Sequence, residues 1–342
     1  MDIAIYGAGA IGLDMGVHLI EAGHRVSLIA RGSTLSTLNQ LGIEHWDLNG
    51  RCRVLPKESF DCFSADEELL PQDIVFLTVK ADALFDISEN IARLLKGDTL
   101  VVSTTNGIPP WYSFLQNNTI GRHLRFTQGR NIFLDRIPGK QIIGAVIERS
   151  VNRRGPNQVV HSFGKGYCIG ELDHTRTERL ESLLALLNQA KLESRVSDDI
   201  HRDIYLKLIG NICVNPLSVL AEKNIGGLLS NPEIRKEMAE IAFEAEAVGL
   251  AIGVIKIGDF AFDRFISFME INLAHHEPSM LQDFRCGKPL ELRRILEVVI
   301  MLAGLKSVGV DVPHLQSLQE RLASKTRSHP ILVGSHSWAN AI

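Results

Sequence analysis

The stretch Ile3-Ala4-Ile5-Tyr6-Gly7-Ala8-Gly9-Ala10-Ile11-Gly12 decides the fold, because it carries an apolar run directly into three glycines at fixed spacing. The run 3–6 predicts a buried strand, and the pattern at 13–22 predicts a helix that ends before Gly23. Gly7 can make a tight turn, Gly9 keeps the backbone clear of a side chain, and Gly12 lets the helix pack closely on the strand. Free N–H groups at the helix start favour a phosphate, so residues 7–12 predict a dinucleotide-binding loop.

The next predicted strand, 25–30, ends at Arg31, the position where such folds distinguish their two nicotinamide cofactors. An Asp or Glu there would bind the ribose 2′-hydroxyl of NAD, whereas an Arg accommodates the 2′-phosphate of NADP. The alternative interpretation is a solvated arginine at a strand end. Because no acidic residue occupies this strand end, we predict NADPH/NADP+ as the cofactor.

Composition is typical of a soluble globular protein. The chain has 342 residues, of which 45% are hydrophobic and 22% charged, and its net charge is −4. This length favours about two domains. The lysines and arginines are scattered and form no basic stripe, so we expect no nucleic-acid partner.

Five cysteines are spread along the chain without a CxxC spacing, which predicts reduced thiols and neither a disulfide frame nor a metal site. The N-terminus lacks a charged segment before its apolar run, and no window holds the ~18 uncharged apolar residues of a membrane span. We therefore expect a cytoplasmic protein with no membrane partner and no metal. The sequence does not fix the oligomeric state, for which a homodimer is one hypothesis.

The chain separates into two parts by pattern. The first part alternates strands and helices, as a parallel sheet with crossover helices requires. Strands are predicted at 3–6, 25–30, 73–79, 99–103, 142–148, 158–162, 167–170 and 193–196, with a further pair within 42–61, and helices at 13–22, 33–41, 84–95 and 177–190. Only helices follow, at 199–220, 232–249, within 257–275, at 289–309 and at 313–323. We predict the α/β class: an N-terminal Rossmann-type domain at 1–198, an all-helical domain at 199–330, a cleft between them, and a tail at 331–342.

Three polar residues directly follow predicted strands of the first domain. They are Arg31, Lys80 and Asn106. Doubly wound sheets bind their ligands outside the carboxyl ends of the strands. We therefore count these three residues with the glycine loop as candidate ligand contacts.

The first helix of the second domain carries a polar stripe beside an apolar one. Steps of four place Lys207, Asn211 and Asn215 on one face, and Ile204 and Leu208 lie on a neighbouring face. Burying such polar groups without partners is unfavourable. Spacing alone leaves two interpretations, a solvated helix face or a polar site.

A second polar cluster comprises Pro-Ser-Met-Leu-Gln-Asp at 278–283 and Gly-Lys-Pro-Leu-Glu at 287–291. Ser279 has the residue type of a helix N-cap, and Glu291 that of an acid in the first turn of a helix. Periodicity alone favours these structural roles.

Together these residues resemble the ketopantoate reductases (2-dehydropantoate 2-reductases). The matching stretches follow the family's order and span nearly the whole chain, so the set is specific although each stretch alone is not. They are GAGAIG at 7–12, Ala30-Arg31-Gly32, Val79-Lys80-Ala81, Thr105-Asn106-Gly107, Lys207-Leu208 with Asn211 and Asn215-Pro216-Leu217, and Ser279-Met280-Leu281-Gln282-Asp283 with Glu291.

The resemblance implies reduction of a 2-oxo acid to the 2-hydroxy acid by NADPH, which for ketopantoate is a step of pantothenate and coenzyme A biosynthesis. It implies that Lys207 bonds the substrate's carbonyl oxygen and supplies the proton, while Glu291 orients the substrate hydroxyl or Lys207. An ammonium suits this role because it stabilises the developing alkoxide and can then protonate it. The remaining implied roles are carboxylate binding by Ser279, substrate positioning by Asn211 and Asn215, and contact with the nicotinamide end by Lys80 and Asn106.

The chain departs from the family where the substrate is expected to bind. Glu291 is followed by LRRILE at 292–297, where the family usually has Ile-Asp-Tyr-Ile-Asn-Gly. His276 and Ile225 stand where asparagines are expected, and the usual Thr-Pro-x-Asn reads Val-Pro-His-Leu at 312–315. The cofactor half and Lys207 therefore match better than the substrate pocket. Ketopantoate is the best single substrate prediction, and another 2-oxo acid is the alternative.

Two other functions compete with this one. The first is a related two-domain dehydrogenase, such as a β-hydroxyacid or opine dehydrogenase, which the matches around Lys207 and Ser279 disfavour. The second is a non-catalytic NADP(H)-binding sensor of the same fold, which the presence of Lys207 and Glu291 together disfavours. NADPH consumption over a panel of 2-oxo acids would distinguish the three.

Overall fold

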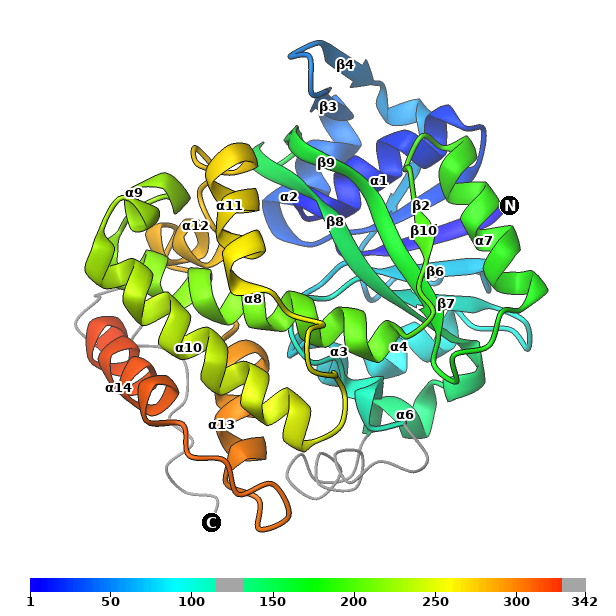
Figure 1. Ribbon diagram of the computed structural model, residues 1–342. Coiled ribbons are helices and arrows are strands. Elements are labelled where there is room, and N and C mark those ends of the chain that lie inside the picture. Colours follow the sequence, from blue (N-terminus) through cyan, green and yellow to red (C-terminus); the bar gives the residue numbers. More distant parts are fainter. Residues whose placement is uncertain (115–131, 328–342) are drawn as a thin grey trace. The chain divides into compact units, whose positions relative to one another are not determined.

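The glycine-rich stretch begins on β1 (Asp2–Tyr6), an inner strand of a mixed sheet (Figure 1). The computed structural model describes residues 1–114 and 132–327, so the predicted tail at 331–342 lies outside the described residues. The chain divides into unit 1, Met1–Ile204, and unit 2, Tyr205–Ile342. This division falls inside helix α8 (Ile200–Ala221), whereas the predicted boundary at 198/199 lies just before that helix.

Within the described residues, ten strands of unit 1 form one sheet in the order β4-β3-β9-β8-β7-β6-β1-β2-β5, with β10 beside β9. The other strands are β2 Arg25–Ile29, β3 Ile43–Trp46, β4 Cys52–Leu55, β5 Asp61–Phe63, β6 Ile74–Leu77, β7 Leu100–Ser103, β8 Ile142–Gly155, β9 Gln158–Glu171 and β10 Arg195–Val196. Strands β2, β1, β6 and β7 are parallel neighbours, with Tyr6 opposite both Ile29 and Leu77, and Leu77 opposite Ser103. Their carboxyl ends therefore share one edge of the sheet.

The helices of unit 1 follow the predicted alternation. They are α1 Ala10–Glu21, α2 Gly32–Leu41, α3 Ala83–Asp86, α4 Ser88–Arg93, α6 Ile132–Arg136 and α7 Glu178–Gln189, with short 3-10 turns η1 Lys57–Ser59, η2 Pro110–Phe114 and η3 Gly139–Gln141. Helix α1 packs on β8 and β9, and α7 packs on β9 and β10. Leu13 and Val17, one helical turn apart on α1, are fully buried in the same apolar core as Ile5 and Leu28. The Rossmann-type prediction is confirmed.

Two predictions for unit 1 are wrong in extent. The strands predicted separately at 142–148, 158–162 and 167–170 belong to one long antiparallel hairpin, β8 with β9 (Figure 1). A register shift interrupts it near Gly164, whose φ is 71° and whose added Cβ would lie 2.0 Å from the oxygen of Glu148. Such a bulge breaks the alternating pattern from which strands are predicted. The helix predicted at 84–95 is broken at Ile87 into α3 and α4.

Unit 2 is all-helical in its described part, as predicted. Besides α8 it contains α9 Ile225–Leu229, α10 Pro232–Ala251, α11 Phe262–Asn272, α12 Ser279–Arg285, α13 Val298–Ala303 and α14 Pro313–Arg327, with a π-helical segment η4 Arg293–Glu297. Helix α10 packs against α9, α13 and α14. It begins where the sequence signals it, because the Asn231 side chain accepts hydrogen bonds from the N–H groups of Glu233 and Ile234. The helix predicted at 289–309 is present but shorter, because a continuous helical run covers 292–303 and its first part, η4, is π-helical.

Helix α8 is the one described helix that is long and apolar enough to cross a membrane by length and composition. However, 67% of its most apolar window is buried inside the protein. Leu208 and Ile212 are almost fully buried, at 1% and 0% exposure. A core helix of a folded unit passes the same test, so this finding gives little weight to a membrane span.

Candidate active site

The glycine loop, residues 7–12, is held against the ends of two neighbouring strands. The N–H group of Gly7 donates to the oxygen of Ile29 at 3.1 Å, and the Thr78 hydroxyl donates to the oxygen of Gly7 at 2.6 Å. Gly7 has a φ of 117°, and a Cβ added to Gly12 would lie 2.1 Å from the oxygen of Gly7. Glycine is therefore required at both positions. The sequence does not single out Thr78, because it falls inside the strand predicted at 73–79.

The N-terminus of α1 has no side-chain cap. Gly9 occupies the N-cap position, and a Cβ added there would meet nothing within 4 Å. The N–H groups of Ala8 and Gly9 are already bonded, to Ile29 and Gly7 oxygens at 3.3 and 2.8 Å. The first N–H groups of the helix, those of Ala10 and Ile11, have no carbonyl partner within α1. An open space before an uncapped helix N-terminus fits the pyrophosphate of a dinucleotide.

The three polar residues predicted beside this loop follow parallel strands that end at the same edge. Arg31 follows β2 and is exposed, and its guanidinium has no hydrogen bond or ion pair within residues 1–114 and 132–327. Lys80 and Asn106 follow β6 and β7 and are half-buried. The strand register therefore brings all three to the edge that carries the glycine loop. This edge therefore carries two cationic side chains and one amide, residue types that suit a phosphorylated cofactor.

A buried ionic network fixes α1 to the sheet. Asp14 is fully buried and accepts from His45 Nε2 at 2.8 Å and from Arg149 Nη2 at 2.9 Å. Burial raises the pKa of Asp14, but the hydrogen bond from His45 and the charge of Arg149 outweigh it, so the pKa is lowered overall. His18, also on α1, donates from Nδ1 to the oxygen of Ala190 at 3.0 Å, and burial lowers its pKa to about 4. Asp14 is thus an anion and His18 a neutral imidazole at neutral pH.

The polar stripe of α8 is not a solvated helix face. Lys207 and Asn211 are half-buried, and Asn215 is only 7% exposed. The Asn211 Nδ2 atom is buried without a hydrogen-bond partner in the described residues. A buried amide donor left in this way is unusual in a folded protein and suits contact with a bound ligand.

The other two predicted substrate residues lie on separate elements of unit 2. Ser279 is the exposed first residue of α12, and the N-cap position belongs to Pro278, so the N-cap role expected for Ser279 is wrong. Glu291 is half-buried and comes just before the helical turn at Leu292; its carbonyl accepts from Ile295 N at 3.1 Å. The following segment, η4, is π-helical, a rare geometry that recurs at functional sites.

The two positions where asparagines were expected are neighbours in the fold. The N–H group of Ile225 donates to the oxygen of His276 at 3.1 Å. Ile225 is 4% exposed, and His276 is half-buried with its pKa lowered by burial. These two departures from the family therefore lie at one place and replace amides with an apolar side chain and a neutral ring.

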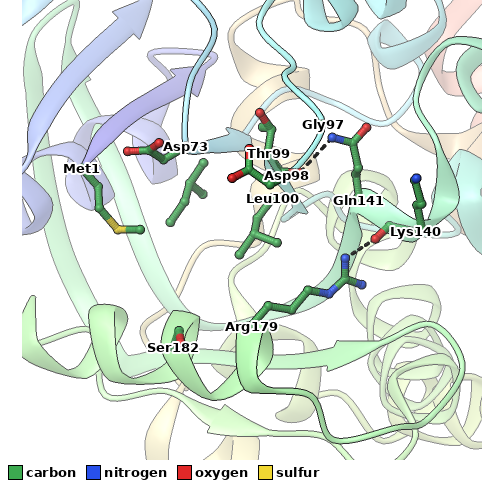
Figure 2. Close-up of a pocket in the computed structure, with 11 residues that line it drawn as sticks. Met1, Asp73, Gly97, Asp98, Thr99, Leu100, Lys140, Gln141, Arg179 and Ser182 are labelled. Atoms are coloured by element: carbon green, nitrogen blue, oxygen red, sulfur yellow. Dashed lines mark hydrogen bonds between the residues drawn. The ribbon is translucent and has the colours of Figure 1, made fainter.

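Two cavities in unit 1 lie at the edges of the sheet. One, of about 460 Å³, lies at the amino-terminal edge of the sheet (Figure 2). Its polar groups satisfy one another: Asp73 pairs with Lys96 at 2.6 Å, Arg179 bonds the oxygen of Lys140, and Gln141 donates to the oxygen of Thr99 at 3.2 Å. The other, of about 490 Å³, lies at the carboxyl edge beside Tyr6 and Ile29, the last residues of β1 and β2, but it is also lined by Asp, Glu and Glu at 66–68, whose charge opposes phosphate binding. Neither cavity supports a phosphate site better than the glycine loop.

Comparison with known proteins matches most of the chain to one family. Residues 3–174 match the model of ketopantoate reductase PanE/ApbA, and residues 199–326 match its C-terminal counterpart. A 2-dehydropantoate 2-reductase of Mesorhizobium japonicum is 32% identical over 89% of this chain and 92% of its own length. The crystal structure of 2-dehydropantoate 2-reductase from Geobacter metallireducens has a TM-score of 0.80 and 27% identity, covering 95% of this chain and 100% of its own. D-mandelate dehydrogenase, solved with NADH and anilino(oxo)acetate, shares the fold at a TM-score of 0.78 and 24% identity, covering 95% and 98%.

Proposed function

We infer the function from the family to which this chain belongs, the ketopantoate reductases. The chain is an oxidoreductase that reduces a 2-oxo acid to a 2-hydroxy acid, and ketopantoate, which gives pantoate, is its leading substrate. The observation that carries this proposal is the carboxyl edge of the unit 1 sheet. There the uncapped N-terminus of α1 and the exposed Arg31 follow neighbouring strands, as a phosphorylated dinucleotide requires.

We propose NADPH, rather than NADH, as the cofactor. Arg31 carries no competing side-chain partner in the described part of the chain, so its full charge is available to a 2′-phosphate. Titration with both cofactors tests this preference, since the D-mandelate dehydrogenase of the same fold was solved with NADH. When bound, the dinucleotide supplies the hydride.

The residues of unit 2 would handle the substrate. Lys207 donates a hydrogen bond to the carbonyl oxygen of the 2-oxo acid and transfers a proton as that oxygen becomes negative. Asn211 offers its buried Nδ2 to a substrate acceptor, which would satisfy a donor that is otherwise left without a partner. Ser279, exposed at the start of α12, binds the substrate carboxylate with its hydroxyl. Glu291 orients either the substrate hydroxyl or Lys207.

The pocket should select weakly for the hydroxyl group of ketopantoate. A site built to bond a hydroxyl rejects analogues that lack it, because its own polar groups are left unpaired. Here Ile225 and His276 stand at adjacent positions where amides were expected. We therefore expect ketopantoate and 2-oxoisovalerate to be turned over within about tenfold of each other, since an apolar pocket separates such pairs by only ~1–3 kcal/mol.

The experiment is NADPH oxidation measured over a panel that contains ketopantoate, 2-oxoisovalerate and a 2-oxo acid with an aromatic group. Turnover of one or more of them supports the reductase. Binding of NADPH without consumption by any of them would favour the non-catalytic sensor. Selectivity for ketopantoate over 2-oxoisovalerate of 10³-fold or more would show that an intact hydroxyl-binding pocket remains. We also propose a homodimer, which light scattering of the purified chain tests.

A further inference from the structure

Two groups of histidine and aspartate in unit 1 bring their ligand atoms within 4.8 Å of one another. The first, Asp14 with His18 and His45, already contains a cation. Arg149 Nε lies 2.9 Å from Asp14 Oδ2, and both side chains are buried. A metal ion there would face the guanidinium at close range, so this group is an ion-pair network and not a metal site.

The second group consists of His174, Asp199 and His201. His174 lies just beyond the end of β9, and the other two lie at the start of α8. His174 Nδ1 is 3.5 Å from Asp199 Oδ1. In a tetrahedral site, two ligand atoms that each lie 2.0–2.2 Å from the ion are roughly 3.3–3.6 Å from each other. His174 Nδ1 and Asp199 Oδ1 therefore have the spacing of two metal ligands. Within the described residues, no lysine or arginine side chain pairs with Asp199.

The His201 ring gives independent evidence for a ligand at this place. The residue is 1% exposed, and both ring nitrogens are buried without a hydrogen-bond partner in the described part of the chain. Trp111 and Tyr112 cover it with ring centroids 5.6 and 5.0 Å away, and the His174 ring lies 5.5 Å away. Burying an imidazole with neither nitrogen satisfied is unfavourable, and coordination of one nitrogen would remove much of that penalty.

We propose that His174, Asp199 and His201 bind a first-row transition-metal ion, for which Zn²⁺ is the probe. Two imidazoles and one carboxylate suit Zn²⁺, Co²⁺ or Ni²⁺, whereas Mg²⁺ and Ca²⁺ prefer oxygen ligands alone. The side chains of His174 and Asp199 are 39% and 36% exposed, so they can adjust around the ion and leave room for water ligands. The ion would tie the segment after β9 to the first turn of α8, the helix that carries Lys207. This site is independent of the proposed reductase activity.

The test is calorimetric titration of Zn²⁺ into the metal-free full-length protein. We expect one ion per chain in the wild type. The substitution His174→Ala removes one of the three proposed ligands, and it does so at an exposed position. Loss of an outer-shell partner weakens metal binding by ~10- to 100-fold, so loss of this direct ligand should weaken Zn²⁺ binding by more than that. The matched control is His314→Ala, which removes an exposed histidine that lies beside Glu240 and Glu244. It should bind Zn²⁺ as the wild type does.

A second variant tests the buried ligand. His201→Phe keeps an aromatic ring between Trp111 and Tyr112 and removes two unsatisfied nitrogens, so the chain should fold without metal. Zn²⁺ should raise the thermal midpoint of the wild type, because it binds only the folded chain, and leave that of His201→Phe unchanged. Absence of stoichiometric binding, or binding undiminished in His174→Ala, would overturn the proposal. Equal loss in the His314→Ala control would overturn it as well.

Discussion

Replacing Arg31 by Ala should convert a cofactor-selective protein into one that barely distinguishes NADPH from NADH. Arg31 is exposed at the carboxyl end of β2, and no described side chain competes for its charge. A charged hydrogen bond to the 2′-phosphate contributes about 1.5–3 kcal/mol. At about 1.4 kcal/mol for each factor of ten, its loss should weaken NADPH binding roughly 10- to 150-fold and leave NADH binding nearly unchanged.

The assay is fluorescence titration of both cofactors at low ionic strength, because salt screens an exposed charge. Arg25→Ala is the matched control: it removes an exposed arginine from the opposite end of the same strand. If Arg31→Ala kept the wild-type preference, or if Arg25→Ala lost it equally, the assignment of the 2′-phosphate contact would be refuted.

Three further predictions concern the support of the site. Gly12→Ala places a Cβ 2.1 Å from a backbone oxygen of the same loop, so a strain of about 1–3 kcal/mol should weaken dinucleotide binding; Gly97→Ala, which meets nothing within 4 Å, should not. Arg149→Met removes the guanidinium from the buried Asp14, which keeps only the hydrogen bond from His45, and should lower the free energy of unfolding in urea by about 3–5 kcal/mol; a change below 1 kcal/mol would contradict the ion pair. The pKa of His18 falls from 6.5 to about 4 on folding, so between these values the unfolded chain binds the extra proton and acid favours unfolding. Protonation of His18 in the unfolded chain should lower the free energy of unfolding by about 3 kcal/mol as the pH drops from 6.5 to 4. The substitution His18→Gln should remove this share of the pH dependence of stability.

The parallel half of the sheet is predictable because its strands are short, apolar and bounded by glycine or polar residues. The full length of the β8–β9 hairpin is not predictable, because Arg149 interrupts the apolar pattern and is buried through bonds to Asp14 and to the oxygen of Lys165, of which Asp14 lies far away in the sequence. Helices α9 and α12 span 5 and 7 residues, too few for a helical period to stand out. Local sequence pattern therefore does not predict a strand or helix whose formation depends on a distant charged residue, or a helix of only one or two turns.

In the candidate site, too, some features follow from local sequence pattern and others depend on distant contacts. The glycine loop and Arg31 follow from local spacing, and the strand register brings them to one edge of the sheet. The Thr78 hydroxyl bond to Gly7 depends on the pairing of β1 with β6, which no local pattern encodes. The isolated Nδ2 atom of Asn211 also depends on packing around α8. Spacing could therefore suggest that Asn211 belongs to a site, but not that its donor lacks a partner.

We propose that Lys207 donates the proton in the reduction of a 2-oxo acid, and the turnover number of Lys207→Ala measures that role. With NADPH and the best 2-oxo acid of the panel, the loss of general acid catalysis should lower kcat by about 10²–10⁴-fold. NADPH affinity should stay within about twofold of the wild type, because the residues proposed to bind the cofactor lie on unit 1. Lys223→Ala, which removes an exposed lysine just beyond the end of α8, should retain wild-type kcat. A Lys207→Ala enzyme that keeps near-wild-type kcat would contradict the proposed mechanism.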